Sequence, residues 1–271
     1  MAQLSLALLG TFRAERAGAP VAGFESDKVR ALLAYLAVEA GRPHRRAALA
    51  ALLWPERPDR AAQLNLNQAL ANLRRVIGDR ESATPLILST RESVQLNPAA
   101  ELALDVATFV GLLDACAAHA HRDSAACAAC AARRARAVAL YGGPFLDGLA
   151  PRDCQPFEEW AVVVRERLHG RMLEALAELA AHHEARGATA EALAAVRRLL
   201  ELEPWREEAH RQAMALIWRA GQRAAALAQY ERCRAILAEE LGAAPDAATE
   251  ALRAAILGGA PPAEPPRHGP P

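Results

Sequence analysis

The stretch Asp59-Arg-Ala-Ala-Gln-Leu-Asn-Leu-Asn-Gln-Ala-Leu-Ala-Asn-Leu-Arg-Arg-Val-Ile-Gly78 combines a regular apolar stripe with a series of amides and arginines. Its apolar residues recur at steps of four, three and four, which places them on one face of an α-helix. These residues are Leu66, Leu70, Leu73 and Ile77. The opposite face is predicted to carry Gln68, Asn72 and Arg75, with Asn65 at its edge and Asn67 and Arg74 on a flank. The sequence therefore predicts an amphipathic helix with a polar outer face.

This outer face has the side chains that read base edges in DNA. Asparagine and glutamine pair with adenine N6 and N7, and arginine pairs with guanine O6 and N7. Residues 60–78 contain no carboxylate, whereas an ordinary solvated helix face mixes acidic with basic side chains. A face that is merely solvated is the plainer alternative, and the residues alone leave it open.

The sequence on either side predicts short strands and two more helices. Residues 4–13 alternate like a strand, and apolar residues at helical spacing predict helices over 28–40 and 45–54. After Gly78, residues 86–97 form two alternating segments around a polar centre, which predicts a β-hairpin. The predicted order is strand, helix, helix, helix, hairpin.

Formal charges cancel over the 271 residues, with 32 basic and 32 acidic side chains, yet they are unevenly distributed. Residues 1–100 hold 13 Arg or Lys against 9 Asp or Glu, and residues 101–271 hold 19 against 23. This asymmetry indicates two domains with different partners, and the basic first part is the candidate for binding an anionic polymer. The overall balance, with 52% apolar residues, excludes a disordered chain and a uniformly basic nucleic-acid coat.

Beyond Pro98 the chain is predicted to be almost wholly helical, and it contains an internal repeat. Residues 186–193 align with residues 220–227 at an offset of 34, and each segment contains a glycine turn. A period of 34 with small residues after such a turn is typical of tetratricopeptide helix hairpins, each of which buries one face on its neighbour. Residues 258–271 are rich in proline and are predicted to form a flexible tail.

The first third of the chain resembles the winged-helix DNA-binding domain of bacterial response regulators, through the order of its elements and the Leu73–Gly78 end of its third helix. The remainder resembles the bacterial transcriptional activator domain. The matching segments are Phe145–Ala150, Phe157–Trp160, Glu203–His210, Arg219–Gly221, Ala226–Leu227, Tyr230–Glu231 and Glu240–Gly242. Together the two domains resemble the antibiotic-regulatory-protein (SARP) class of activators, over nearly the whole chain apart from the last dozen residues.

The resemblance implies a mainly α protein with a small β component. It implies a winged helix-turn-helix domain over 1–103, a tetratricopeptide-like activator domain over 104–257 and the tail over 258–271. It also implies a sequence-specific transcriptional activator that binds double-stranded DNA without a cofactor, contacts RNA polymerase and forms a homodimer. The third helix would lie in the major groove and the hairpin wing on the minor groove or backbone. The implied DNA-contacting residues are Asn65, Gln68, Asn72, Arg74, Arg75, Thr90, Arg91, Arg45 and Arg46.

A second group of residues has the spacing of metal ligands. Cys116 with His119, and Cys127 with Cys130, form two pairs spaced i, i+3, one at the predicted end of a helix and one at the start of the next. Three sulfurs and an imidazole complete a tetrahedral zinc shell, and a helix N-terminus favours thiolates. His121 is an alternative to His119, and cysteines packed as small apolar residues among alanines are the alternative to metal binding. The hypothesis is a structural zinc ion.

Several other functions lack the residues that they need. The single lysine, Lys28, is not in a phosphate-binding loop and no Gly-x-Ser-x-Gly occurs, so we expect no enzyme. No apolar run reaches the ~18 residues of a membrane span, so we expect a cytoplasmic protein without membrane contact. The second candidate function is a protein-interaction scaffold whose winged helix does not bind DNA. Its partner binding would depend only weakly on salt, whereas DNA binding depends on it steeply.

Overall fold

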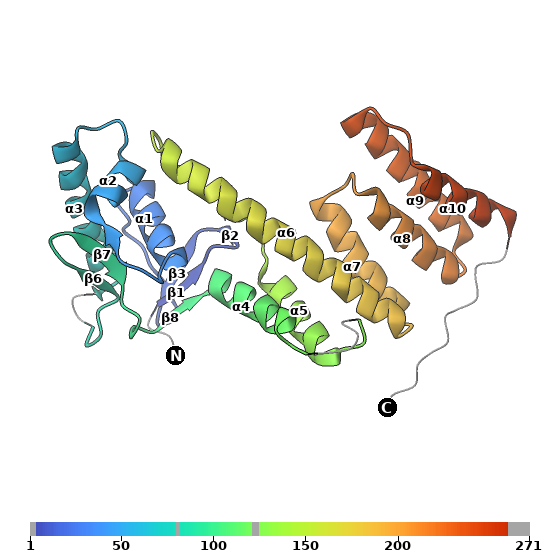
Figure 1. Ribbon diagram of the computed structural model, residues 1–271, viewed down its shortest axis with the longest axis horizontal. Coiled ribbons are helices and arrows are strands. Elements are labelled where there is room, and N and C mark those ends of the chain that lie inside the picture. Colours follow the sequence, from blue (N-terminus) through green and yellow to red (C-terminus); the bar gives the residue numbers. More distant parts are fainter. Residues whose placement is uncertain (1–3, 80–81, 121–124, 260–271) are drawn as a thin grey trace. The chain divides into compact units, whose positions relative to one another are not determined.

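The structure is a computed structural model, which describes residues 4–79, 82–120 and 125–259 (Figure 1). Most of the predicted tail and the alternative ligand His121 lie outside the described residues. The helices are α1 (Asp27–Val38), α2 (Arg46–Leu53), α3 (Asp59–Val76), α4 (Asp105–Ala117), α5 (Ala128–Leu140), α6 (Gln155–Ala185), α7 (Thr189–Leu202), α8 (Glu207–Arg219), α9 (Arg223–Ile236), the π-helical segment η2 (Leu237–Leu241) and α10 (Ala247–Gly258). The strands are β1 (Leu4–Ala7), β2 (Gly10–Thr11), β3 (Arg13–Arg16), β4 (Ala19–Pro20), β5 (His44–Arg45), β6 (Ile87–Ser89), β7 (Ser93–Leu96), β8 (Leu102–Leu104) and β9 (Phe145–Asp147).

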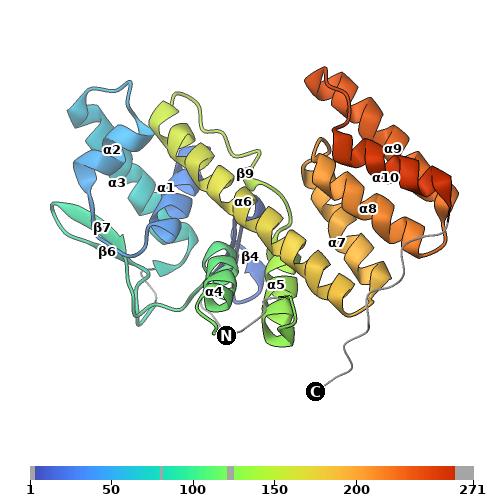
Figure 2. The ribbon, with the colours of Figure 1, turned by 45° about the vertical axis from the view of Figure 1, so that its right-hand side comes forward.

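The chain divides into two compact units, one of residues 1–111 with 139–170 and the other of residues 112–138 with 171–271. Each unit therefore consists of two separate segments of the chain, and the long helix α6 begins in the first unit and ends in the second. Helices predominate in both units, and the strands form small sheets (Figure 1, Figure 2). The predicted fold class, mainly α with a small β component, is confirmed.

Three helices and a three-stranded sheet form the winged-helix part of the first unit (Figure 2). Helix α3 packs against α2 and α1, and the leucines that face this core are fully buried. They include Leu32, Leu36, Leu49, Leu53, Leu66 and Leu73. The sheet has the order β5-β7-β6, and both pairings are antiparallel. The hairpin of β6 and β7 is the wing that the alternating pattern of residues 86–97 predicted.

The end of α3 is fixed by a glycine and joined to the wing by an aspartate. Gly78 has a φ of 65°, a left-handed conformation that stops a helix and that favours glycine. The buried carboxylate of Asp79 then accepts hydrogen bonds from the backbone N–H groups of Leu86 and Ile87, the second at 3.3 Å. The start of β6 is therefore held at the C-terminus of α3.

The four-stranded sheet of the first unit has the order β4-β3-β1-β8, and its β1–β8 pair is parallel. Asp105, the first residue of α4, anchors the chain after β1, because its Oδ2 accepts from the N–H groups of Leu8 and Leu9, both at 2.8 Å. Burial raises the pKa of Asp105, and these hydrogen bonds oppose the rise because they favour the carboxylate. One side chain thus satisfies two backbone donors from a distant segment.

Residues 139–170 complete the core of the first unit. Strand β9 pairs with β2, and the first half of α6 contributes Trp160. The Trp160 ring lies 4.9 Å from that of Tyr35 on α1 between centroids, and its Nε1 donates to Glu39 at 3.1 Å. The thiol of Cys154, which is buried, donates to the backbone oxygen of Leu52 at 3.4 Å. The DNA-binding part implied by the sequence therefore packs against residues well beyond position 103.

The second unit contains the predicted repeat. Helices α7 and α9 begin 34 residues apart and also end 34 residues apart. Each follows a glycine in the left-handed conformation, Gly187 with a φ of 69° and Gly221 with a φ of 78°. The equivalent core positions are all buried, namely Val196 with Tyr230 and Leu199 with Cys233. The helix-hairpin repeat is confirmed. Among the described residues, no helix has the length and apolarity that crossing a membrane requires.

Candidate nucleic-acid interface

The solvent-facing side of α3 is mixed in chemistry and carries no acidic group between its first residue and Gly78. After Asp59, its exposed side chains are Arg60, Leu64, Asn67, Gln68, Ala71 and Arg75. We call these six residues the outer face. The predictions that Gln68 and Arg75 face away from the core are confirmed. An outer face of this kind offers hydrogen-bond donors, acceptors and an aliphatic group on a rigid rod.

The prediction that Asn72 lies on the outer face is wrong. Its side chain is buried, with 3% of the residue exposed. Asn72 Nδ2 donates to the backbone oxygen of Gly23 at 3.2 Å, and its Oδ1 accepts from the N–H of Glu25 at 3.3 Å. The segment before α1 covers this side of α3, and its backbone groups need partners once they leave water. Asn72 therefore positions that segment and does not reach solvent.

Two further predicted DNA contacts are partly withdrawn from the surface. Asn65 is only half-exposed, at the border between the core and the outer face. Arg74 extends toward the wing, where its guanidinium donates to Ser89 Oγ at 2.6 Å and to the Ile87 backbone oxygen at 3.4 Å. Its Nε also lies 3.7 Å from Asp79 Oδ2. These contacts make Arg74 a link between α3 and β6.

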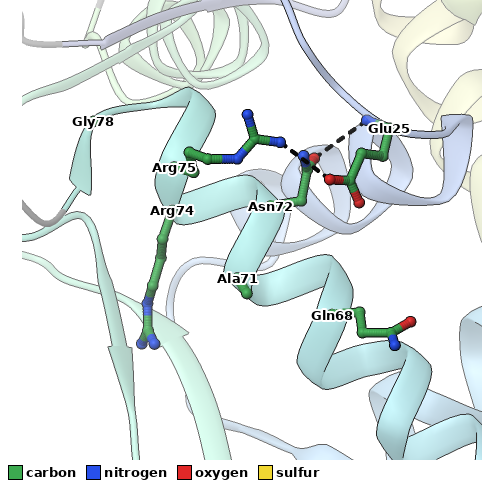
Figure 3. A pocket seen from close by; sticks show the side chains of 7 residues that line it. All are labelled: Glu25, Gln68, Ala71, Asn72, Arg74, Arg75 and Gly78. Carbon is green, nitrogen blue, oxygen red and sulfur yellow. Dashed lines mark hydrogen bonds and ion pairs between the residues drawn. The ribbon is translucent and has the colours of Figure 1, made fainter.

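Arg75 is on the outer face but has an acidic neighbour. Its guanidinium forms an ion pair with Glu25 at 3.0 Å, and both side chains are well exposed (Figure 3). Both residues line a shallow hollow together with Gln68 and Asn72 (Figure 3). An exposed ion pair of this kind is weak, so Arg75 can exchange its carboxylate partner for another acceptor.

The arginines predicted at the start of the second helix and at the wing tip come together. Strand β5 pairs with β7, so Arg45 lies next to Ser93 on the wing. Arg45, Arg46, Thr90 and Arg91 line one hollow, which Gln63 of α3 also borders. The hollow contains one carboxylate, Glu92, against its three arginines. The Thr90 hydroxyl oxygen accepts from the N–H of Ser93 at 3.0 Å and so closes the wing turn.

Four residues of the outer face, Arg60, Leu64, Asn67 and Ala71, were missed as candidate contacts. Leu64 is 57% exposed, so an aliphatic side chain faces solvent among the polar residues of this face. Asn67 Oδ1 accepts a hydrogen bond from Arg46, and this places the amide between α3 and the arginine hollow. The sequence could have indicated that Leu64 is exposed, because it is the one leucine of this helix that lies outside the predicted apolar stripe.

The cysteines and histidine predicted as metal ligands also come together, in the second unit. His119, Cys127 and Cys130 have ligand atoms that all lie within 4.8 Å of one another. Cys116 is buried and its thiol donates to the Cys130 backbone oxygen at 3.5 Å. Backbone N–H groups at the start of α5 lower the pKa of Cys127, whereas burial and the neighbouring thiols raise the pKa of Cys130 to about 11.

A winged helix with a basic, amide-rich outer face, joined on one chain to tetratricopeptide-like hairpins, has the architecture of a transcription regulator. Residues 104–257, more than half of the chain, match the family described as the bacterial transcriptional activator domain. The chain belongs to this family, and it is a regulator of the SARP class.

Similar proteins are known from Streptomyces and Mycobacterium. The regulatory protein AfsR of Streptomyces griseus is 29% identical over 258 residues, which are 94% of this chain and 24% of AfsR. The transcriptional regulatory protein EmbR of Mycobacterium tuberculosis is 28% identical over 94% of this chain and 63% of EmbR. The solved structure of M. tuberculosis EmbR in complex with a low-affinity phosphopeptide aligns with a TM-score of 0.71 and 26% identity, over 97% of this chain and 67% of that one. The chain thus spans less than two thirds of the length of these two curated relatives.

Proposed function

We propose that this chain is a sequence-specific DNA-binding transcriptional activator. The observation that carries the proposal is the outer face of α3, which lacks carboxylates and lies beside a hollow lined by three arginines. A helix of this chemistry fits the major groove, and the arginines of the hollow beside it fit the phosphates. The reading of the chain as a regulator is supported by its relatives, two of which are described as regulatory proteins.

Base reading is assigned to the exposed part of α3. Gln68 can pair with adenine and Arg75 with guanine, once Arg75 releases Glu25. Leu64 and Ala71 are exposed on the same face and can contact thymine methyl groups. Asn65 lies at the border of this face and is kept as a minor contact. Asn72 and Arg74 are assigned positioning roles, because their polar atoms are engaged inside the winged helix.

Phosphate and minor-groove contacts are assigned to the hollow between α2 and the wing. Arg45, Arg46 and Arg91 are the cations there, and Thr90 shapes the turn that presents Arg91. Phosphate contacts fix the position of the protein on the duplex without specifying sequence. Their loss should therefore weaken binding to all sequences alike.

Activation is proposed to involve the helical-repeat part, through contact with RNA polymerase and through formation of a homodimer, as the family resemblance implies. Action on chromosomal DNA would place the protein in the cytoplasm. The proposal needs no cofactor for DNA binding.

The experiment compares variants of the full chain on a DNA site selected from a random library. Gln68→Ala and Arg75→Ala should each weaken binding to the selected site by ~1–3 kcal/mol and relax the preference at one base pair. Arg167→Ala removes an exposed arginine from α6 and is the matched control. Unchanged site preference in both α3 variants would remove α3 from its assigned role.

The salt dependence of the same binding reaction distinguishes the scaffold alternative. Binding through several phosphates should weaken steeply as salt rises, and Arg45→Ala, Arg46→Ala or Arg91→Ala should each lower the slope by about one unit. A chain that selects no DNA sequence and binds a protein partner with little response to salt would support the scaffold instead.

A further inference from the structure

Three side chains near the end of α4 and the start of α5, His119, Cys127 and Cys130, form a compact group of nitrogen and sulfur atoms, and Cys116 lies beside it. His119 Nδ1 lies 3.2 Å from Cys130 Sγ and 3.5 Å from Cys127 Sγ. In a tetrahedral zinc site the ligand bonds of about 2.0–2.3 Å place neighbouring nitrogen and sulfur ligands roughly 3.6 Å apart. The two distances from His119 are therefore already close to this spacing, and the two sulfurs lie within 4.8 Å of each other.

The backbone holds these atoms in place from both sides of the turn. Cys116 lies in the last turn of α4, and the His119 N–H donates to its backbone oxygen at 3.3 Å. Cys127 immediately precedes α5, and its backbone oxygen accepts from the N–H of Ala131 at 3.0 Å. Cys127 thus occupies the N-terminus of α5, where the helix dipole stabilises a thiolate. Cys130 is one turn further along the same helix.

Cys116 is suited to be the fourth ligand. It is 4% exposed, and its Sγ lies 3.5 Å from the Cys130 backbone oxygen, on the side of the cluster nearest α4. The resulting ligand sequence is Cys-x2-His-x7-Cys-x2-Cys, two close pairs separated by a short connection, as in structural zinc sites.

We propose that Cys116, His119, Cys127 and Cys130 bind one zinc ion that ties the end of α4 to the start of α5. The thiols lose their protons to solvent when the four metal–ligand bonds form, and no oxidant or reductant is required. Thiolates and imidazole select zinc over magnesium or calcium, which prefer oxygen ligands. Four protein ligands leave no open position for catalysis, so the ion is structural.

The test uses the full chain, purified without chelators. It should retain one zinc ion per chain, and replacement by Co²⁺ should give tetrahedral d–d bands and a sulfur-to-cobalt charge-transfer band that reflects three thiolates. Cys127→Ser and Cys130→Ser should lose the zinc. Cys116→Ser should lower the charge-transfer intensity by about a third. Cys233→Ser, which removes a buried thiol from α9, is the matched control and should keep the metal.

His119→Cys keeps the proposal testable if the serine variants fold poorly, because four thiolates also hold zinc. It should bind Co²⁺ with a stronger charge-transfer band than the parent chain. Far-UV circular dichroism checks that each variant is folded. Absence of bound zinc together with absence of a cobalt–thiolate band in the parent chain would overturn the proposal. A cobalt–thiolate band that survives in both Cys127→Ser and Cys130→Ser, or a Cys127–Cys130 disulfide in freshly purified protein, would do so as well.

Discussion

Asn72 differs from the other amides of α3 because both ends of its side chain are hydrogen bonded inside the winged helix. The outward-facing Gln68, one turn earlier on the same helix, lines the hollow of Figure 3 from its exposed side. The two residue types are chemically alike, so their roles are separated by burial alone. Substitution to alanine should therefore affect stability at one position and DNA binding at the other.

Asn72→Ala is expected to lower the free energy of unfolding by ~1–3 kcal/mol. The substitution leaves the Gly23 oxygen and the Glu25 N–H without their partner in a partly buried place. Urea unfolding followed by circular dichroism measures the change, and Gln68→Ala, at an exposed site, should stay within about 0.5 kcal/mol of the parent chain. If Asn72→Ala is as stable as the parent chain but loses DNA sequence preference, the result would contradict a positioning role and indicate that Asn72 contacts DNA.

Glu25→Gln is expected to strengthen DNA binding a few-fold. The carboxylate competes with DNA for Arg75 and repels phosphates, whereas its exposed ion pair contributes little to stability. The backbone N–H that bonds Asn72 is unchanged by the substitution. Titration of a DNA site at two salt concentrations measures the effect, which should be larger at low salt. Glu15→Gln, on β3, is the control, and weaker binding by Glu25→Gln would contradict the expectation.

At the scale of elements, the sequence predicted the helices and strands whose ends and buried faces are set by residues within or next to the same element. The leucine stripe and Gly78 defined α3, the alternation of residues 86–97 defined the wing, and the glycine turns defined the repeat. The exposure of Asn72 was predicted wrongly because it depends on the segment before α1, which is nearly 50 residues away in sequence. The contact of Arg74 with the wing was missed because it depends on the packing of β6 against the end of α3. Helical periodicity predicts which face of a helix lies in the core, but it does not predict which residues beside that face are covered by other segments.

In the second unit, helices α8 and α9 are joined by His210. The ring is buried, with Nε2 donating to the Pro204 backbone oxygen at 2.8 Å and Nδ1 lying 2.7 Å from Gln229 Nε2. Burial lowers the pKa of His210 below its ordinary value of 6.5; nearby Arg232 also lowers it, while the Pro204 hydrogen bond and Glu207 oppose the shift. The folded state thus favours the neutral ring.

The free energy of unfolding should therefore decrease as pH falls below about 6.5. The unfolded chain takes up the His210 proton at a higher pH than the folded chain, so the stabilisation is fully present above the unfolded pKa and is lost as pH falls through the folded pKa. Denaturant unfolding at a series of pH values measures this slope. His210→Gln should flatten it. A slope that is unchanged in His210→Gln would exclude this origin.

At the scale of the whole molecule, the compact units do not coincide with the boundary predicted after residue 103, because the first unit runs on to Gly111 and also contains a later segment. The first unit includes residues 139–170, although they lie within the segment 104–257 that matches the activator-domain family. The N–H of Leu146 donates to the backbone oxygen of Leu8 at 2.9 Å, and that of Gly142 to Leu9 at 3.2 Å. These bonds connect parts of the chain more than 130 residues apart, a distance at which sequence periodicity carries no information.

A fragment of residues 1–103 is therefore expected to be much less stable than the same residues in the full chain. The fragment lacks residues 139–170, so the fully buried Leu8 becomes exposed and Tyr35 loses its contact with Trp160. Truncation of a core aromatic side chain costs about 3–5 kcal/mol; Trp160 and Tyr35 are only partly buried, so the loss of their contact costs less, but together with the exposure of Leu8 it is a large part of the stability of a small domain. Hydrogen exchange of the α3 amides, followed by mass spectrometry, compares the fragment with the full chain.

Trp160→Ala in the full chain provides the matched measurement, because it weakens the same packing without removing any backbone. It should raise the exchange rates of the α1 and α3 amides, although Trp160 lies on α6, and should leave those of α9 unchanged. DNA affinity should fall in proportion to the folded fraction, with the base preference of the remaining folded molecules intact. If the fragment instead exchanges as slowly as the full chain and binds DNA equally well, the winged helix is independent of residues 139–170 and the boundary after residue 103 is also a boundary of folding.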